Sequence, residues 1–161
     1  MSEVSGEPLR QSSGLLTHMT DQKTRILCVE DNKDSRDVLR RLLESSSENY
    51  QVTAVETAAE ALALDSRDGY DLYILDIWLP GMDGVDLCRR LRDRGRVSPV
   101  MFYSAMGVQP ADRDYVLAAG ANAFLVKSVD IDKLLPTVES LLAEYYAKPN
   151  PSSEIPLTPT T

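Results

Sequence analysis

Cysteine is scarce in this chain of 161 residues: only Cys28 and Cys88 occur, far apart on apolar segments. That number and spacing exclude a disulfide framework and a zinc site, and predict two buried free thiols. No apolar run approaches the roughly 20 residues that cross a bilayer. The first twenty residues also lack the basic start and apolar core of a secretory signal. We therefore expect a cytoplasmic protein with no membrane-inserted segment.

Positive charge is also in short supply, since 17 Lys and Arg stand against 25 Asp and Glu, for a formal net charge of −8. Nucleic-acid binding needs a basic patch that neutralises phosphates, so this balance argues against a nucleic-acid partner. An excess of acids fits divalent-cation binding where some of them converge. Most acidic surfaces are only solvated faces.

Both ends of the chain lack a hydrophobic period. Residues 1–22 are rich in Ser, Gly, Thr and Gln, and residues 148–161 are rich in Pro, Ser and Thr. We expect two disordered tails around one domain at residues 23–147. The C-terminal tail is too short to fold an output domain, so we expect a single-domain protein.

Between these tails, short apolar runs alternate with amphipathic segments. The apolar runs predict five strands, at residues 25–29, 51–56, 71–75, 98–103 and 122–126. The amphipathic segments predict five helices, at residues 33–46, 57–67, 84–93, 110–119 and 130–146. Asn32 is placed to cap the first helix, and Thr57 with Glu60 forms a capping box for the second. Ile131 is assigned to the buried face of the last helix, and Pro136 is expected to bend that helix.

This alternation predicts an α/β fold, a doubly wound five-stranded parallel sheet with helices on both faces. In such folds, sites form at the carboxyl ends of the strands, near the point where the strand order reverses. Glu30 and Asp31 follow the first strand, and Asp76 follows the third. Ser104 follows the fourth and Lys127 the fifth. If the strand order is 2-1-3-4-5, the three acids share one pocket, with Ser104 and Lys127 beside it.

Such a pocket needs a cation. Two carboxylates about 4 Å apart repel by roughly 4 kcal/mol at an effective dielectric near 20. Lys127 offsets only part of the charge of three acids, and a hard divalent ion with oxygen ligands fits the deficit, so we expect Mg²⁺. A metal lets a carboxylate meet a phosphate, and an aspartate can attack phosphorus to give an acyl phosphate.

The segments "ILCVEDN", "DLYILDIWLPGMDG", "MFYSA" and "AGANAFLVK" resemble, in order and spacing, the receiver domains of bacterial two-component response regulators. The resemblance covers about residues 24–145 and implies a flavodoxin-like (βα)5 fold with strand order 2-1-3-4-5. It implies that Asp76 accepts a phosphoryl group from the phosphohistidine of a sensor histidine kinase or phosphotransfer protein. Mg²⁺ would be held by Asp31 and Asp76, by Glu30 through water, and by the backbone carbonyl of Trp78.

The resemblance also implies that Ser104, Lys127 and the backbone N–H of Ala105 contact the phosphoryl oxygens. Ser104 and Phe124 would form the switch pair, in which the aromatic ring turns inward when the serine moves toward the phosphate. Such a protein is not an enzyme with an external product, because it catalyses only its own phosphorylation and dephosphorylation. Such a protein passes its signal to an unidentified downstream target through protein contacts. Tyr146 on the last helix is compatible with a homodimer, and this alternative stays open.

The sequence departs from the family pattern after Lys127, where Ser128 stands in place of the usual proline. A cis bond before a non-proline residue costs about 2.5–4 kcal/mol, so we expect a trans bond and a differently placed loop. Trp78 and Met106 are bulky at positions that influence how water attacks the acyl phosphate in the family. We expect them to shield it and prolong the phosphorylated state.

Two alternatives stay open. The first is a receiver-like binding module that recognises partners without being phosphorylated. The second is a Mg²⁺-dependent phosphatase with an aspartyl nucleophile, which commonly has a second aspartate two residues on, where this chain has Trp78. The single histidine, His18, lies in the N-terminal tail and offers no replacement. An FMN-binding protein is weaker, because no Ser/Thr-Gly phosphate loop follows the first strand.

Overall fold

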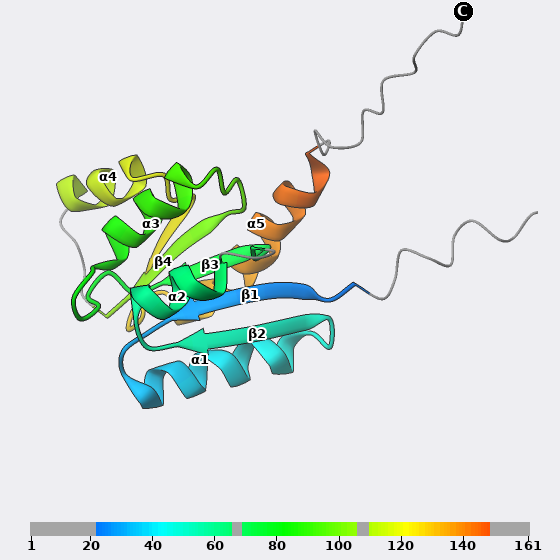
Figure 1. Ribbon diagram of the computed structural model, residues 1–161. Helices are drawn as coiled ribbons and strands as arrows, with labels where there is room; N and C mark the ends of the chain where they lie inside the picture. Colours follow the sequence, from blue (N-terminus) through cyan, green and yellow to red (C-terminus); the bar gives the residue numbers. More distant parts are fainter. Residues whose placement is uncertain (1–21, 66–68, 106–109, 149–161) are drawn as a thin grey trace, which may run out of the picture.

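The structure, a computed structural model, describes residues 22–65, 69–105 and 110–148, without the side chains of residues 110–112. Its centre is a five-stranded parallel sheet with the order β2-β1-β3-β4-β5, which confirms the expected fold class (Figure 1). The strands are β1 (Thr24–Val29), β2 (Tyr50–Val55), β3 (Leu72–Leu75), β4 (Val100–Ser104) and β5 (Ala123–Val126). β3 and β4 are buried along their whole length, as apolar runs in a covered parallel sheet should be.

Helices cover both faces of this sheet (Figure 1). They are α1 (Lys33–Ser46), α2 (Ala58–Asp65), α3 (Gly84–Asp93), α4 (Pro110–Ala118) and α5 (Leu134–Ala147), with a 3-10 turn, η1 (Ile131–Lys133), before α5. Alternate residues of β1 divide the core: Ile26 packs with α1 and α5, whereas Leu27 packs on the side of α2, α3 and α4. The Asn32 side chain accepts from the N–H of Ser35, which confirms the expected cap of α1.

The last helix differs from its prediction. It begins at Leu134, not at Asp130, and the residues between form η1. Pro136 therefore lies in the first turn of α5, where a missing backbone N–H leaves no intrahelical bond unmade, and the expected interior bend has no cause. Ile131 is 57% exposed, so its assignment to the buried face was wrong. The helical spacing of apolar residues predicted the buried face correctly from Leu134 onward, but not at Ile131, one turn earlier.

Several expectations fall outside the described residues: most of both tails, His18, Met106 and the end of the second helix near Arg67. Cys28 and Cys88 are buried free thiols, as predicted. Burial raises the pKa of both thiols by disfavouring the thiolate. Within the described ranges, no helix has the length and apolar character needed to cross a membrane.

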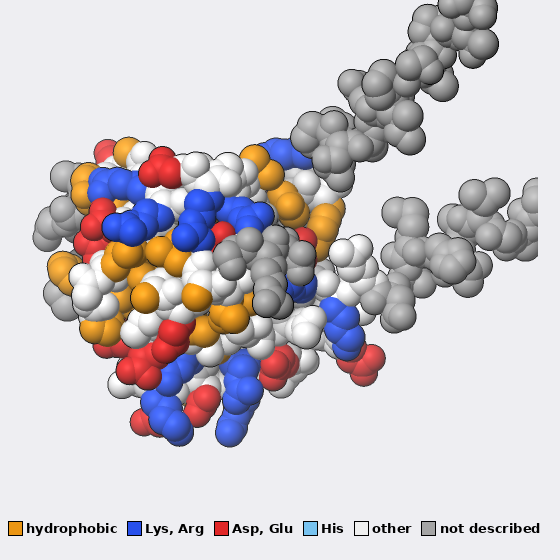
Figure 2. All heavy atoms as spheres, viewed as in Figure 1, with side chains coloured by type: hydrophobic (Ala, Val, Ile, Leu, Met, Phe, Trp, Pro, Cys, Tyr) orange, Lys and Arg blue, Asp and Glu red, His pale blue; other side chains and the backbone are white. Residues whose placement is uncertain are grey.

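Arginines are concentrated on α3 and the loop after it, and Figure 2 shows a row of basic side chains over this part of the molecule. Arg92 donates to the backbone carbonyls of Gly120, Arg96 and Ser98 at 2.7–2.9 Å. Arg96 pairs with the fully buried Asp65 of α2. These guanidinium groups therefore fasten the loops at the amino ends of β4 and β5, away from the acidic edge of the sheet.

Candidate functional site

A cavity of about 610 Å³ opens at the carboxyl edge of the sheet, where β1 and β3 are paired neighbours. The loops after β1, β3, β4 and β5 all contribute to its walls. The cavity is lined by Glu30, Asp31, Asn32, Ser35, Asp76, Trp78, Ser104, Ala105 and Lys127. The topology thus brings together the polar residues that follow four separate strands, as the expected strand order required.

Asp76 is buried at the end of β3, with 7% of its surface exposed, and both of its carboxylate oxygens are occupied. The Ser104 hydroxyl donates to Oδ1 at 2.8 Å, and the backbone N–H of Trp78 donates to the same oxygen at 3.1 Å. Lys127 donates from Nζ to Oδ2 at 2.9 Å. The three donors compensate for lost hydration and fix the orientation of the carboxylate.

Glu30 is also buried, and its carboxylate accepts from Lys127 Nζ and, at 3.1 Å, from the backbone N–H of Asn32. Burial raises the pKa of Glu30, and the contacts with Lys127 oppose this only in part. Burial also disfavours the charge on Lys127, but its bonds to Glu30 and Asp76 outweigh burial and raise the pKa of Lys127. Both groups hold their protons more strongly than in water, Glu30 because it is buried and Lys127 because it is bonded to two carboxylates.

Asp31 completes an acidic cluster. One carboxylate oxygen each from Glu30, Asp31 and Asp76 lies within 4.8 Å of the others, and Asp31 is the exposed member. Within the described residues, Lys127 is the ammonium bonded to this cluster, which leaves two negative charges uncompensated when all three acids are ionised. Converging carboxylate oxygens are the donor set that Mg²⁺ prefers, so the residues present fit a hard divalent cation.

The acidic loop has a support that sequence reasoning missed. Arg36, on the first turns of α1, donates from one nitrogen to the backbone carbonyls of Glu30 at 2.6 Å and Asp31 at 3.1 Å. Its other terminal nitrogen lies 3.7 Å from the Glu56 carboxylate at the end of β2. The Arg36 side chain therefore holds the loop after β1 through the backbone carbonyls of Glu30 and Asp31. A charged residue on a polar helix face carries no signal of such a role.

Gly84, the first residue of α3, is a second supporting residue that the sequence did not reveal. Its N–H donates to the carbonyl of Ile77 at 2.8 Å, which brings the start of the helix against the loop after β3. A Cβ at this position would lie 2.0 Å from the backbone oxygen of Asp76. Only glycine permits this approach, and the loop that carries Asp76 depends on it.

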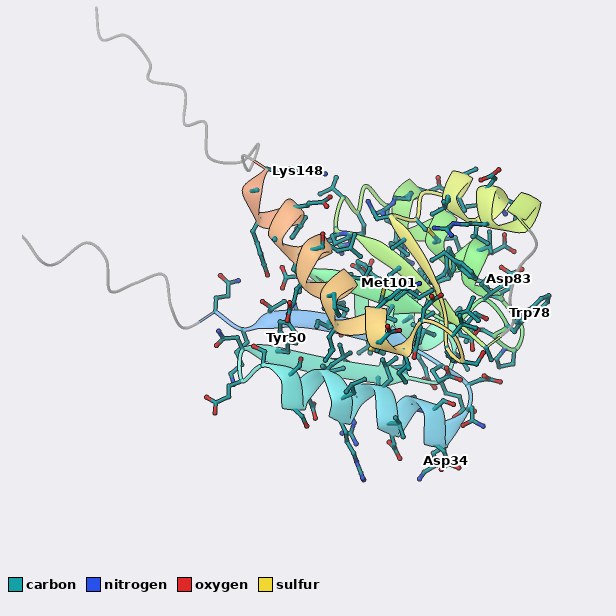
Figure 3. The ribbon with its side chains drawn as sticks, turned by 180° about the vertical axis from the view of Figure 1, so that it is seen from behind. Asp34, Tyr50, Trp78, Asp83, Met101 and Lys148 are labelled. Carbon is teal, nitrogen blue, oxygen red and sulfur yellow. The ribbon has the colours of Figure 1, made fainter. Side chains whose placement is uncertain are left out.

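Trp78 and Ala105 lie where the sequence placed them, at the rim of the cavity. The Trp78 residue is 62% exposed, and Figure 3 shows its side chain pointing away from the domain. The exposed indole does not close over Asp76 in this arrangement. The shielding expected from Trp78 therefore stays a prediction.

The expected switch residues lie on the neighbouring strands β4 and β5. Ser104 faces the cavity and bonds Asp76, whereas Phe124 of β5 is buried in the core together with Val116 of α4 and Ala119. The role of Ser104 and Phe124 as a switch pair stays a prediction. Phe124 does not line the cavity, so any influence on the site passes through β5 and α4.

The loop after β5 carries Ser128 at the position where the family usually has proline. The described residues contain no cis peptide bond, so the bond between Lys127 and Ser128 is trans, as expected. Lys127 nevertheless reaches both Glu30 and Asp76. The missing proline therefore does not withdraw the ammonium from the cavity.

Comparison with known proteins agrees with this geometry. The family model described as the response regulator receiver domain matches residues 26–139. The chain is 34% identical over 120 residues to the transcriptional regulatory protein ResD of Bacillus subtilis, covering 74% of this chain and 48% of that protein. It is 35% identical over 130 residues to the response regulator MprA of Mycobacterium leprae, with coverages of 81% and 55%. The chain thus spans about half the length of these curated relatives.

Solved structures give the same answer. The response regulator protein TrrA of Thermotoga maritima, in complex with Mg²⁺-BeF, superposes with a TM-score of 0.65 at 30% identity, covering 73% of this chain and 98% of that one. A two-component response regulator of the LuxR family from an Aurantimonas species gives a TM-score of 0.70 at 28% identity, with coverages of 76% and 87%. The family match over more than half of the sequence, on a sheet of the expected order, means that this chain belongs to the receiver domain family of two-component response regulators.

Proposed function

We propose that the protein is a phosphorylation-activated switch in which Asp76 accepts a phosphoryl group from the phosphohistidine of a kinase or phosphotransfer protein. One observation carries this proposal: a buried aspartate with both oxygens oriented stands within 4.8 Å of two further carboxylates, in a cavity open to a donor. A carboxylate held in this way is a nucleophile whose alignment is fixed before the donor arrives.

In the proposed step, a carboxylate oxygen of Asp76 attacks phosphorus, and the bond between phosphorus and the donor imidazole nitrogen breaks. The phosphoryl group becomes an acyl phosphate on Asp76, and the electron pair leaves with the imidazole nitrogen, which takes a proton. Lys127, whose raised pKa keeps it charged, would then pair with a phosphoryl oxygen. Ser104 and the N–H of Ala105, both at the cavity wall, would donate to the other oxygens.

Glu30, Asp31 and Asp76, together with the backbone carbonyl of Trp78, would hold Mg²⁺. The cation supplies charge neutralisation, so that an anionic phosphoryl group can approach an anionic carboxylate. Lys127 alone does not neutralise this charge, because its ammonium is already paired with two of the three acids. The fit rests on the number and chemistry of the oxygen donors.

The surroundings of the cavity favour a protein donor. A smaller groove of about 170 Å³ begins at Glu30 and Lys127 and continues between α1 and η1. Val38 and Ile131 line it and are exposed by 61% and 57%. Exposed apolar side chains beside a polar cavity are typical of surfaces that contact another protein. A donor docked there could present its imidazole to Asp76.

The same site supports signalling through contacts made by α4 and β5. Phosphorylation adds about −1.5 to −2 charges at one pocket and gives Ser104 a new acceptor. Phe124 lies on β5, the strand paired with that of Ser104, and belongs to the same core cluster as Val116 of α4, so a shift of Ser104 and β5 would reach α4. We propose that downstream partners read this surface, and that the protein works with other proteins rather than by turnover of a substrate.

The test is phosphorylation by phosphoramidate, a small donor with a phosphorus–nitrogen bond, followed by intact mass. Wild type with Mg²⁺ should gain the mass of one phosphoryl group, labile to hydroxylamine, and EDTA should prevent the gain. Asp76→Asn should gain nothing, whereas Asp93→Asn, an exposed aspartate at the end of α3, should behave as wild type. Labelling of Asp76→Asn to the wild-type extent would refute the assignment of the acceptor.

The two alternatives make opposite predictions in this assay. A binding module that is not phosphorylated gives no labelling of wild type with phosphoramidate or with a phosphorylated phosphotransfer protein. A phosphatase gives steady hydrolysis of a phosphomonoester such as p-nitrophenyl phosphate. We expect no steady hydrolysis, because an exposed indole occupies the position of the second aspartate.

A further inference from the structure

The loop after β5 must hold Lys127 in place beside the acidic cluster. Lys127 has a long side chain that loses rotamer freedom when it is fixed. Its ammonium nevertheless meets two carboxylates, although Ser128 replaces the proline that usually follows this lysine in the family. The backbone of Lys127 must therefore be held by other groups.

Asp130 supplies the missing restraint. Its Oδ2 accepts from the backbone N–H of Val126 at 2.9 Å, and its own backbone N–H donates to the carbonyl of Val126 at 2.8 Å. Both backbone groups of the residue before Lys127 are thus bonded to Asp130. The N–H of Val126 belongs to β5, an edge strand, and would otherwise have no partner in the sheet.

The Asp130 side chain points back toward β5. Asp130 immediately precedes η1, the position from which an aspartate usually caps a helix, yet its side chain accepts no capping bond from a backbone N–H of η1. The carboxylate turns back over the loop instead, and its side chain is only 15% exposed. Its Oδ2 therefore bonds the backbone of the strand end before Lys127, and no backbone N–H at the helix start after it.

Lys127 is restrained from the other side as well. Its backbone N–H donates to the carbonyl of Ser104 at 2.8 Å, and the N–H of Val129 donates to Val126 at 3.1 Å. The segment from Val126 to Asp130 is thereby closed into a turn whose inner edge is bonded to a residue of the site. With the backbone of Lys127 held between Ser104 and Asp130, the side chain starts from a fixed point, from which its ammonium reaches Glu30 and Asp76.

We propose that Asp130 is a positioning residue for Lys127, which aims the ammonium at Asp76 by closing the turn after β5. The inference rests on the proposed phosphorylation of Asp76 and adds a residue to its machinery. Asp130 does not touch the reacting atoms, so its effect must pass through Lys127. A misplacement of a catalytic group by about 1 Å is enough to slow a reaction substantially.

Three variants separate this role from a general structural one. Asp130→Ala removes the bond to Val126, Asp130→Asn keeps an acceptor oxygen for it, and Lys133→Ala removes only the exposed ion pair of 2.7 Å with Asp130. With phosphoramidate and saturating Mg²⁺, Asp130→Ala should slow phosphorylation roughly tenfold, the equivalent of one hydrogen bond. Asp130→Asn and Lys133→Ala should stay within about twofold of wild type, since a lost surface ion pair has little effect.

A double-mutant cycle gives the decisive readout. If Asp130 acts through Lys127, adding Asp130→Ala to Lys127→Ala should cause no further slowing. An equal slowing on both backgrounds, or wild-type rates in Asp130→Ala, would overturn the proposal.

Amide hydrogen exchange tests, without any phosphorylation, whether Asp130 holds the backbone of Lys127. The N–H of Lys127 should exchange faster in Asp130→Ala and at the wild-type rate in Lys133→Ala. Unchanged exchange at Lys127 in Asp130→Ala would overturn the positioning role. Failure of wild type to be phosphorylated would refute the proposed function alone and leave the exchange measurement to decide the role of Asp130.

Discussion

Replacing Gly84 by alanine tests whether the loop that carries Asp76 depends on the close start of α3. The new Cβ would meet the backbone oxygen of Asp76 at 2.0 Å, its carbonyl carbon at 2.9 Å and the Cα of Ile77 at 3.1 Å. All three are backbone atoms, so no side-chain rotation relieves the contact. Non-bonded heavy atoms pack at about 3.5 Å, so α3 and the loop must separate by more than about 1 Å.

The energetic cost follows from that movement. Overpacking costs about 1–3 kcal/mol where neighbours adjust, and a backbone neighbour puts Gly84→Ala at the upper end, near 3 kcal/mol. For a domain of this size, such a loss lowers Tm by roughly 10 °C. The separation would also shift Asp76, so the variant should accept phosphoryl groups more slowly even where it remains folded.

Gly81→Ala is the matched control in the same loop. Gly81 has a φ of +79° but no atom within 4 Å of an added Cβ, so alanine there pays only for left-handed backbone, about 1 kcal/mol. Urea unfolding followed by circular dichroism gives both free energies of unfolding. A cost for Gly84→Ala no greater than that for Gly81→Ala would refute the steric argument.

Three further outcomes follow from the site. Mg²⁺ at 100 times its Kd should stabilise wild type by about 2.7 kcal/mol against urea, and Asp31→Asn should lose most of this gain. Burial raises the pKa of Glu30, so folding favours its protonated form and wild type loses that contribution as pH rises through the folded pKa. In EDTA, Glu30→Gln should therefore gain stability relative to wild type as pH rises through that range, and a pH-independent difference between their urea curves would contradict the raised pKa. Trp78→Asn should lose its phosphoryl group faster than wild type in a time course of intact mass, and an unchanged lifetime would count against shielding by the indole.

The sheet and the meeting of its acids were predictable because they depend on patterns that the sequence displays. Apolar runs marked the strands, and the topology of a doubly wound sheet placed Glu30, Asp31 and Asp76 at one edge. The start of α5 was missed because the helical period of the apolar residues extends back to Ile131, although the backbone there forms a 3-10 turn. Periodicity reports which residues could share a face and not where a helix begins.

The supporting residues were not predictable for a different reason. Arg36 acts on two backbone carbonyls, and Asp130 acts on the backbone N–H of Val126. Backbone groups are identical at nearly every position, so the sequence does not show which of them lack partners. Such contacts become visible only when the chain is folded.

The exposed indole of Trp78 has a practical consequence, because it is the single tryptophan of the chain. Light that excites indole selectively does not excite the seven tyrosines, so all fluorescence comes from Trp78, whose backbone N–H is bonded to Asp76. Cation entry, phosphoryl transfer and the docking of a donor all take place beside that chromophore. The unlabelled protein thus carries its own optical probe, and the kinetics of each event can be followed by stopped flow without altering a residue.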